Sequence, residues 1–485
     1  MEQYIDGRVK DFWRLPPVLG ELELIDDMCR LVIIFYPQDT NSTLKLSLNQ
    51  KDVHGEVDLN TEICDISQLV QSEKDKPTRM IINYLVPNCI YLASWSQNDQ
   101  RIYQHEINTY TNVSKIVFVS CDLLEGDCRH SMWKTLNNNM VNIPNNLKDL
   151  GRNLFVHLGD QVYMDKIFNR GYNLLRHDID EADQNILREM RERYNQTWSR
   201  HHNPLSNMNN LMIWDDHEIT NDLILDEEND PRKLRIADLA VQVYKEYQES
   251  LHLTAIQGPH RSWYKLLSSR NIHNQEKDVL LVAIERTSTN VDLSDVFKLI
   301  VNACRNTEHC VRRLILCFSS GPIPGPQGFW GNFYHRWQGR SKFWDPTELK
   351  RLYCWLLDWI TRGGYKKEVL LVGGDFHFGL LGRVSRGEHH FNVMISSPIT
   401  NHPALDRAVA VQGLGGHQDL GSGITFTTTT THAKRCYGHV DLNGDVIHPH
   451  LEFSHDIIPK NPFSFVKSAA AAANFGAGKT KINDD

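Results

Sequence analysis

Four short apolar runs of this sequence end on side chains that can bind metal ions. These side chains are carboxylates, imidazoles, a thiol and a phenol. In chain order they are Cys121 and Asp122 after residues 116–120, Asp160 and Tyr163 after residues 154–158, Asp215-Asp216-His217-Glu218 after residues 211–214, and Asp375 and His377 after residues 369–372. So many ionisable groups are costly to bury together unless metal ions neutralise them.

The ligand types suit phosphoester hydrolysis. A metal ion lowers the pKa of a bound water from 15.7 to about 7, and two ions about 3.5–4 Å apart can hold the attacking and leaving oxygens. Arg286 and Arg383 could hold a phosphate group with two parallel hydrogen bonds, although ordinary surface arginines fit both positions as well. Each motif alone also fits a turn or a surface loop, and the metal interpretation depends on their joint occurrence.

The runs themselves predict buried strands. Continuous apolar runs of this length are typical of strands covered on both faces, and ligands bind where such strands meet their loops. Strand patterns also occur at 279–284, 314–318, 423–431, 436–442 and 447–453, and helix patterns at 180–200, 232–251 and 347–361. Strands that alternate with helices predict an α/β fold, with a mostly parallel sheet between helices.

The first 110 or so residues differ from this pattern. Short strand-like runs separated by polar turns predict a small antiparallel β-sandwich without chemistry of its own; they are 30–36, 43–48, 79–85 and 89–95. We therefore expect a sandwich domain over 1–112, a catalytic domain over 113–460 and a frayed tail over 461–485.

Composition narrows the functional class. The 485 residues are 41% hydrophobic and 23% charged, and the net charge of −8 does not indicate nucleic-acid binding, although a local basic patch is compatible with it. No apolar run approaches the length of a membrane span, and no secretory signal opens the chain. Ten cysteines in a chain of this length do not form a disulfide scaffold, so we expect an intracellular, reduced protein.

Taken together, the motifs resemble the PhoD-like (alkaline phosphatase D) branch of the calcineurin-like metallophosphatases. The matching segments are Val119-Ser120-Cys121, His157-Leu158-Gly159-Asp160-Gln161-Val162-Tyr163, Trp214-Asp215-Asp216-His217-Glu218, Gly374-Asp375-Phe376-His377 and Ser396-Ser397-Pro398. The resemblance implies a metallophosphatase-like β-sheet core between helices, often preceded by a β-sandwich.

The resemblance also implies roles for individual residues. Asp160 would bridge two metals, and His217 would bind the phosphoryl group or protonate the leaving oxygen. The remaining implied ligands are Cys121, Tyr163, Asp216, Asp375 and His377. One departure stands out, because Ser319-Ser320-Gly321-Pro322 occupies the place where the superfamily has a further histidine. Asp122 has no assigned role beyond that of a loop residue or an acid behind the ligands.

The implied metals are Fe³⁺ with Ca²⁺. A thiolate and a phenolate suit ferric iron better than magnesium or calcium. Zn²⁺ and Mn²⁺ are the alternatives, because a reducing cytosol disfavours ferric iron. The expected substrate is a small-molecule, lipid or nucleotide phosphoester, with monoester and diester both open. The competing hypothesis is a non-catalytic interaction protein that keeps the fold and uses metal only for stability.

Overall fold

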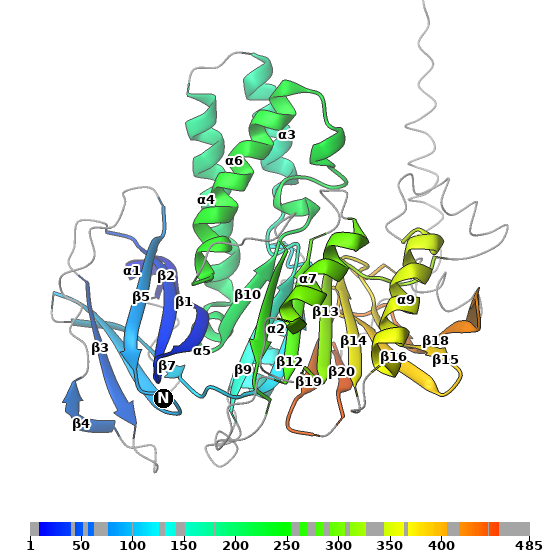
Figure 1. The fold of residues 1–485 in the computed structure, drawn as a ribbon. Helices are drawn as coiled ribbons and strands as arrows, with labels where there is room; N and C mark the ends of the chain where they lie inside the picture. Colours follow the sequence, from blue (N-terminus) through cyan, green and yellow to red (C-terminus); the bar gives the residue numbers. More distant parts are fainter. Residues whose placement is uncertain are drawn as a thin grey trace, which may run out of the picture. The chain divides into compact units, whose positions relative to one another are not determined.

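The strands that lead to the candidate ligands lie in two β-sheets of the computed structural model (Figure 1). The strand orders are β10-β9-β8-β19-β20 in the five-stranded sheet and β11-β12-β13-β14-β16-β15-β18-β17 in the eight-stranded sheet. The structure describes residues 9–39, 44–51, 57–62, 76–98, 100–125, 131–141, 151–177, 181–253, 262–269, 278–285, 292–305, 311–325, 344–362, 367–404, 417–444 and 446–454.

Three parallel strands of the five-stranded sheet carry the first three motifs. They are β8 (Val113–Val119), β9 (Arg152–Leu158) and β10 (Asn209–Ile213). The antiparallel strands β19 (Cys436–Asp441) and β20 (His448–Phe453) complete the sheet beyond β8. Because β8, β9 and β10 run in the same direction, their carboxyl ends lie at one edge.

The eight-stranded sheet carries the fourth motif. Its parallel strands are β12 (Val279–Ile284), β13 (Arg313–Ser320), β14 (Glu368–Gly374) and β16 (His389–Ile395). Antiparallel strands flank them on both sides, namely β11 (Trp263–Leu267), β15 (Gly379–Arg386), β17 (His417–Gly421) and β18 (Ile424–His432). The last motif therefore enters the site from a different sheet than the first three.

The apolar runs are buried on both faces, as predicted. In β8, Ile116 and Phe118 pack in a core shared by the two sheets, whereas Val117 and Val119 pack in a core shared with helices. In β14, Leu370 and Val372 face the shared core, and their neighbours join the core on the other face. The sheets thus stack face to face, and helices cover their outer faces.

Helices cover the outer face of each sheet. On the five-stranded side lie α2 (Ser131–Leu136), the π-helix η1 (Asn137–Val141), α3 (Asp165–Arg176), α4 (Ala182–Arg200), α5 (His202–Asn207), α6 (Pro231–Tyr247) and η5 (Glu249–Leu251). On the eight-stranded side lie α7 (Leu293–Arg305) and α9 (Pro346–Thr361). Asp345 caps α9 by accepting hydrogen bonds from Thr347 N at 2.8 Å and Glu348 N at 3.2 Å, close to the predicted start. Among the described residues, no helix combines the length and apolar character of a membrane span.

The N-terminal part forms the predicted antiparallel sheets. One sheet holds β1 (Trp13–Ile25), β2 (Met28–Pro37) and β5 (Thr78–Leu85), and the other holds β4 (Val57–Glu62), β3 (Leu44–Lys51), β6 (Ile90–Gln97) and β7 (Gln100–Asn108), with the short α1 (Val9–Phe12) ahead of β1. Trp13 and Phe35 of the first sheet pack against Trp95 of the second, with ring centroids 5.5 and 4.8 Å away. These contacts close the sandwich core.

The fold class is confirmed, but the single, mostly parallel sheet is not. The core consists of two mixed sheets, because antiparallel strands border the parallel ones in both. A continuous apolar run has the same appearance in one large sheet and in two stacked sheets, since both bury its two faces. The domain boundaries at 112 and 460 stay predictions, and the tail over 461–485 lies outside the described residues.

Candidate metal centre

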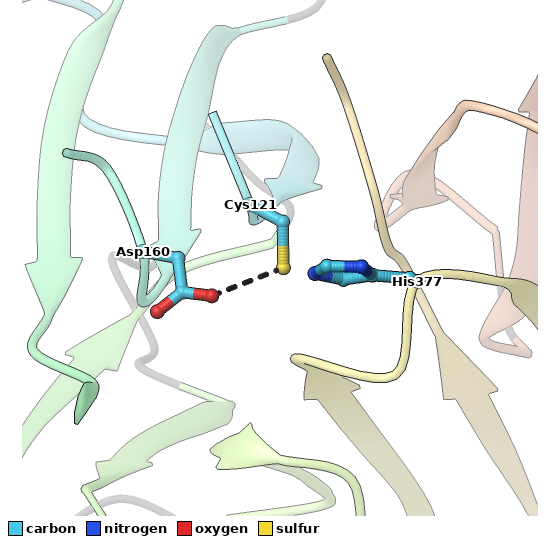
Figure 2. Close-up of side chains that lie close together, drawn as sticks. All are labelled: Cys121, Asp160 and His377. Atoms are coloured by element: carbon cyan, nitrogen blue, oxygen red, sulfur yellow. Dashed lines mark hydrogen bonds between the residues drawn. The ribbon is translucent and has the colours of Figure 1, made fainter. Parts of the chain in front are cut away.

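The candidate ligands of the two sheets meet at the strand ends. Figure 2 shows Cys121, Asp160 and His377 pointing toward one another from three segments of the chain. Their ligand atoms all lie within 4.8 Å of one another, and Cys121 Sγ is 3.4 Å from Asp160 Oδ2. This cluster joins two residues from the five-stranded sheet to one from the eight-stranded sheet.

Two further groups share Asp160. In one, Asp160 combines with Asp216 and His217, and in the other with Asp215, Asp216 and Asp375, with ligand atoms within 4.8 Å in each group. Asp160 is thus common to every group of potential ligands among the described residues. Two carboxylate oxygens make it geometrically suited to face more than one ion.

The backbone at these positions has an uncommon conformation. Cys121, Asp160, Asp375 and His377 have φ values of +59°, +58°, +62° and +58°, in the left-handed region that residues other than glycine rarely adopt. Such conformations cluster at active sites, where the surrounding structure holds the strain. Phe376, between Asp375 and His377, is buried in the core between the eight-stranded sheet and its helices.

These dihedral angles describe how the chain turns after β14. Residues 375–377 do not form an extended segment with alternating side chains, because the chain bends after β14. Asp375 and His377 nevertheless both reach the cluster at Asp160, since the two left-handed residues reverse the direction of the backbone.

Two glycines allow the strand ends to approach closely. A Cβ atom on Gly159 would lie 2.4 Å from Asp215 Cβ. A Cβ atom on Gly374 would lie 2.7 Å from Leu158 O and 2.8 Å from Ser319 O. Only glycine fits these contacts, so the Gly-Asp pairs at 159–160 and 374–375 let the aspartates approach one another.

Asp165 orients His217. His217 Nδ1 lies 2.8 Å from Asp165 Oδ2, and Asp165 also accepts hydrogen bonds from Asn221 N at 2.8 Å and Thr220 Oγ1 at 3.3 Å. Burial lowers the pKa of His217, but the charge of Asp160 and the hydrogen bond to Asp165 raise it to about 10. Because a carboxylate only accepts hydrogen bonds, His217 carries a proton on Nδ1, toward Asp165, and Nε2 is left for a further contact.

The donor set fits a cation. Burial, followed by the charge of Asp160, raises the pKa values of the Cys121 thiol and the Tyr163 phenol well above their ordinary values. A bound cation would oppose both effects, because it stabilises the anionic forms. Asp216 Oδ1 is buried and accepts no hydrogen bond, and Asp216 Oδ2 accepts one from Asp222 N at 2.6 Å.

Glu218 joins the loops that follow β9 and β10. Its Oε2 accepts hydrogen bonds from Asp160 N at 3.2 Å and Asp215 N at 2.8 Å, and its Oε1 from Gln161 N at 2.8 Å and Gln248 Nε2 at 3.2 Å. Burial raises the pKa of Glu218 to about 8, and the charge of Asp160 adds to the rise, whereas the four donors favour the carboxylate. Glu218 is the last residue of the short helix η3 (Asp216–Glu218). Its hydrogen bonds fix the backbone of two candidate ligands, Asp160 and Asp215.

We expect Glu218→Gln to weaken metal binding about 10–100-fold, the usual cost of losing a group that orients ligands. The new amide would turn an N–H₂ group toward backbone N–H donors and leave them without an acceptor. Dialysis against zinc with elemental analysis measures the loss. Glu246→Gln is the control, because Glu246 pairs with Arg191 at 2.7 Å away from the cluster. Equal zinc affinity in the two variants would contradict this role of Glu218.

The structure also locates residues that the motif analysis left without a role. Asp122 accepts hydrogen bonds from Trp133 Nε1 at 3.2 Å and Thr400 Oγ1 at 2.9 Å, so it holds the loop behind Cys121. Asp165, Ser397 and Asn401 contact candidate ligands, and the sequence analysis gives none of them a role. The Ser-Ser-Pro segment was the only signal for the last two, and Asp165 had no signal beyond its place five residues after Asp160.

Only one of the two predicted phosphate-binding arginines lies in the described part of the structure. Arg286 lies outside the described residues. Arg383 is exposed in the middle of β15, paired in register with Asn392 and Thr427. Since strands rise about 3.3 Å per residue, Arg383 lies about 13 Å along β15 from Gly379. Its contact with a substrate stays a prediction.

Comparison with known proteins agrees with the sequence resemblance. Residues 116–268 match the family model of PhoD-like phosphatases. The fold is similar to a structure titled "Structure of PhoD", with a TM-score of 0.56 and 11% identity over 96% of this chain and 99% of that chain. It is also similar to purple acid phosphatase PPD1 from yellow lupin (Lupinus luteus) seeds, with a TM-score of 0.53 and 8% identity over 91% of this chain and 72% of that one. No curated protein sequence matches the chain.

Proposed function

We propose that this protein hydrolyses phosphoesters with metal ions held at the two sheet ends, because residues 116–268 match the family model of PhoD-like phosphatases. The observation that carries the proposal is the position of Asp160, which all three groups of candidate ligands share. The family match and the ligand cluster support a metal-dependent phosphoesterase in general. The roles of individual residues are our inference from their geometry.

The candidate ligands divide into two sets around Asp160. Cys121, Tyr163 and His377 would hold one ion, and Asp216 and Asp375 would complete a second site. When bound, the ions supply a water nucleophile at neutral pH and neutralise charge on the phosphoryl oxygens.

His217 is the proposed proton donor. Its Nδ1 is held by Asp165 at 2.8 Å, so Nε2 is the nitrogen left for the substrate. Protonation by Nε2 would release the leaving oxygen as an alcohol, and the Asp165 carboxylate would keep the imidazole oriented throughout the reaction. Tyr163 packs against this imidazole, with ring centroids 4.2 Å apart, and limits its rotation.

We further propose Fe³⁺ beside Cys121 and Tyr163, with Ca²⁺ at the carboxylate-rich side, and Zn²⁺ or Mn²⁺ as the alternatives. A buried phenol ionises only beside a strongly polarising ion. Tyr163 is buried, and its Oη lies 3.1 Å from Asp160 Oδ2. A thiolate with a phenolate is a poor ligand set for calcium, whereas an all-carboxylate set suits it.

Iron-loaded protein is expected to show a visible charge-transfer band, and Tyr163→Phe is expected to shift or abolish it, because the substitution removes the phenolate. Absorption spectra of the two proteins at equal iron content measure the effect. Tyr437→Phe is the control, since Tyr437 accepts a hydrogen bond from Asn139 away from the cluster. A colourless zinc or manganese enzyme of full activity that is indifferent to Tyr163→Phe would refute the iron assignment.

Hydrolysis of aryl phosphates tests the proposed activity. Protein stripped with a chelator should be inactive toward nitrophenyl phosphate and its bis-ester, and added metal should restore turnover of at least one of them. The monoester-to-diester ratio then decides between phosphatase and phosphodiesterase activity. Metal-loaded protein that hydrolyses neither ester would favour the competing hypothesis of a metal-stabilised interaction protein.

A further inference from the structure

A fifth strand end contributes to the cluster, namely the loop that follows β16. Ile399 N donates to Ser120 O at 2.9 Å, and Asn401 N donates to Cys121 O at 3.2 Å. Ser397 Oγ lies 3.2 Å from Cys121 Sγ and accepts a hydrogen bond from His377 N at 3.0 Å. The loop therefore links the end of β8 in one sheet to the turn after β14 in the other.

Asn401 has an amide orientation that its neighbours determine. Its Oδ1 accepts a hydrogen bond from His402 N at 2.6 Å, so the amide oxygen is turned away from the ligands. Its Nδ2 then faces Tyr163 Oη at 2.7 Å and His377 Nε2 at 3.4 Å. The side chain is buried, with 8% of the residue exposed.

The contacts form a chain of hydrogen bonds with one direction. Asn401 Nδ2 donates to Tyr163 Oη, so the hydroxyl proton of Tyr163 points to its other neighbour, Asp160 Oδ2, at 3.1 Å. If the phenol ionises, the same amide N–H stabilises the negative oxygen. In both states Asn401 holds Tyr163 Oη beside Asp160.

We propose that Asn401 is a positioning residue that holds the Tyr163 oxygen in place for metal binding. This inference rests on the proposed function, because it assigns Tyr163 to the metal centre. Asn401 itself acts through Tyr163 and needs no contact with metal or substrate. It is the residue through which the loop after β16 acts on the cluster.

The test is a double-mutant cycle with Tyr163→Phe, read out as zinc affinity by competition with a chelating dye. We expect Asn401→Leu to lower zinc affinity about 10–100-fold in the wild-type background. In the Tyr163→Phe background, we expect less than about a threefold further loss, because the oxygen that Asn401 holds is already absent. Asn401→Ala gives a second variant that introduces no bulk, and thermal unfolding identifies any variant that fails to fold.

Asn139→Leu is the matched control. Asn139 Nδ2 also donates to a tyrosine, Tyr437 Oη at 3.0 Å, but away from the cluster, so its loss should leave zinc affinity unchanged. Unchanged affinity in folded Asn401→Leu and Asn401→Ala, or equal losses in both backgrounds, would overturn the proposal. Neither result would affect the proposed function, which fails instead if Asp160→Asn retains full metal content and activity.

Discussion

Asp160→Asn is expected to lose more than about 100-fold in metal affinity and to lose hydrolysis with it. Replacement of groups that only orient ligands commonly costs 10–100-fold, and Asp160 lies within ligand distance in all three groups of candidate ligands. The amide keeps the shape of the side chain but removes a negative charge and one of the two ligand oxygens. Elemental analysis and hydrolysis of nitrophenyl phosphate measure the two losses together.

Asp358→Asn provides the control for Asp160→Asn. Asp358 lies on α9 and pairs with Arg386 of β15, so its replacement removes a carboxylate without changing the cluster. If Asp160→Asn bound metal as tightly as Asp358→Asn, Asp160 would not be a ligand, and the shared position of Asp160 would need a different explanation.

His217→Ala is expected to keep its metal and to lower the rate of the chemical step by about 10²–10⁴-fold, the usual contribution of a positioned acid or base. The loss should be greater for an alkyl phosphate than for nitrophenyl phosphate, because an alkoxide needs the proton more than a nitrophenolate does. Single-turnover rates on the two substrates at full metal occupancy measure this difference.

Asp165→Asn separates proton donation from metal binding at His217. Asp165→Asn should lower the rate of the chemical step, as His217→Ala does, because Asp165 holds His217 Nδ1 at 2.8 Å. If His217→Ala instead lost metal, His217 would be a ligand with Asp160 and Asp216, as their spacing also allows. Wild-type rates in both variants would exclude any role for His217 in the reaction.

Much of the fold could be predicted from hydrophobic patterns. The strands β9, β12 and β14 coincide with their predicted runs within two residues, because a buried strand needs a continuous apolar stretch. The division into two sheets could not be predicted, since the pattern records burial and not the partner strand. The strands β15 and β16 could not be predicted, because polar residues interrupt their apolar pattern.

The candidate site was predictable to the extent that its residues follow strands. Cys121, Asp160, Asp216 and Asp375 each lie within three residues of the end of an apolar run, and the structure gathers them. Glu218 was noted within its motif, but its role depends on Asp160 N and Gln161 N, which are far from it in sequence. Asn401 was missed for the same reason, because its partner Tyr163 lies 238 positions away.

Metal content measured together with turnover tests the central claim most directly. Purified protein is stripped with a chelator and titrated with iron and calcium, and separately with zinc or manganese, while bound metal and hydrolysis of nitrophenyl phosphate and its bis-ester are followed. We predict that turnover appears in proportion to bound metal in the wild type and that Asp160→Asn shows neither binding nor turnover. Turnover that is independent of bound metal, or metal-loaded wild type without turnover on either ester, would contradict metal-dependent phosphoester hydrolysis at this site.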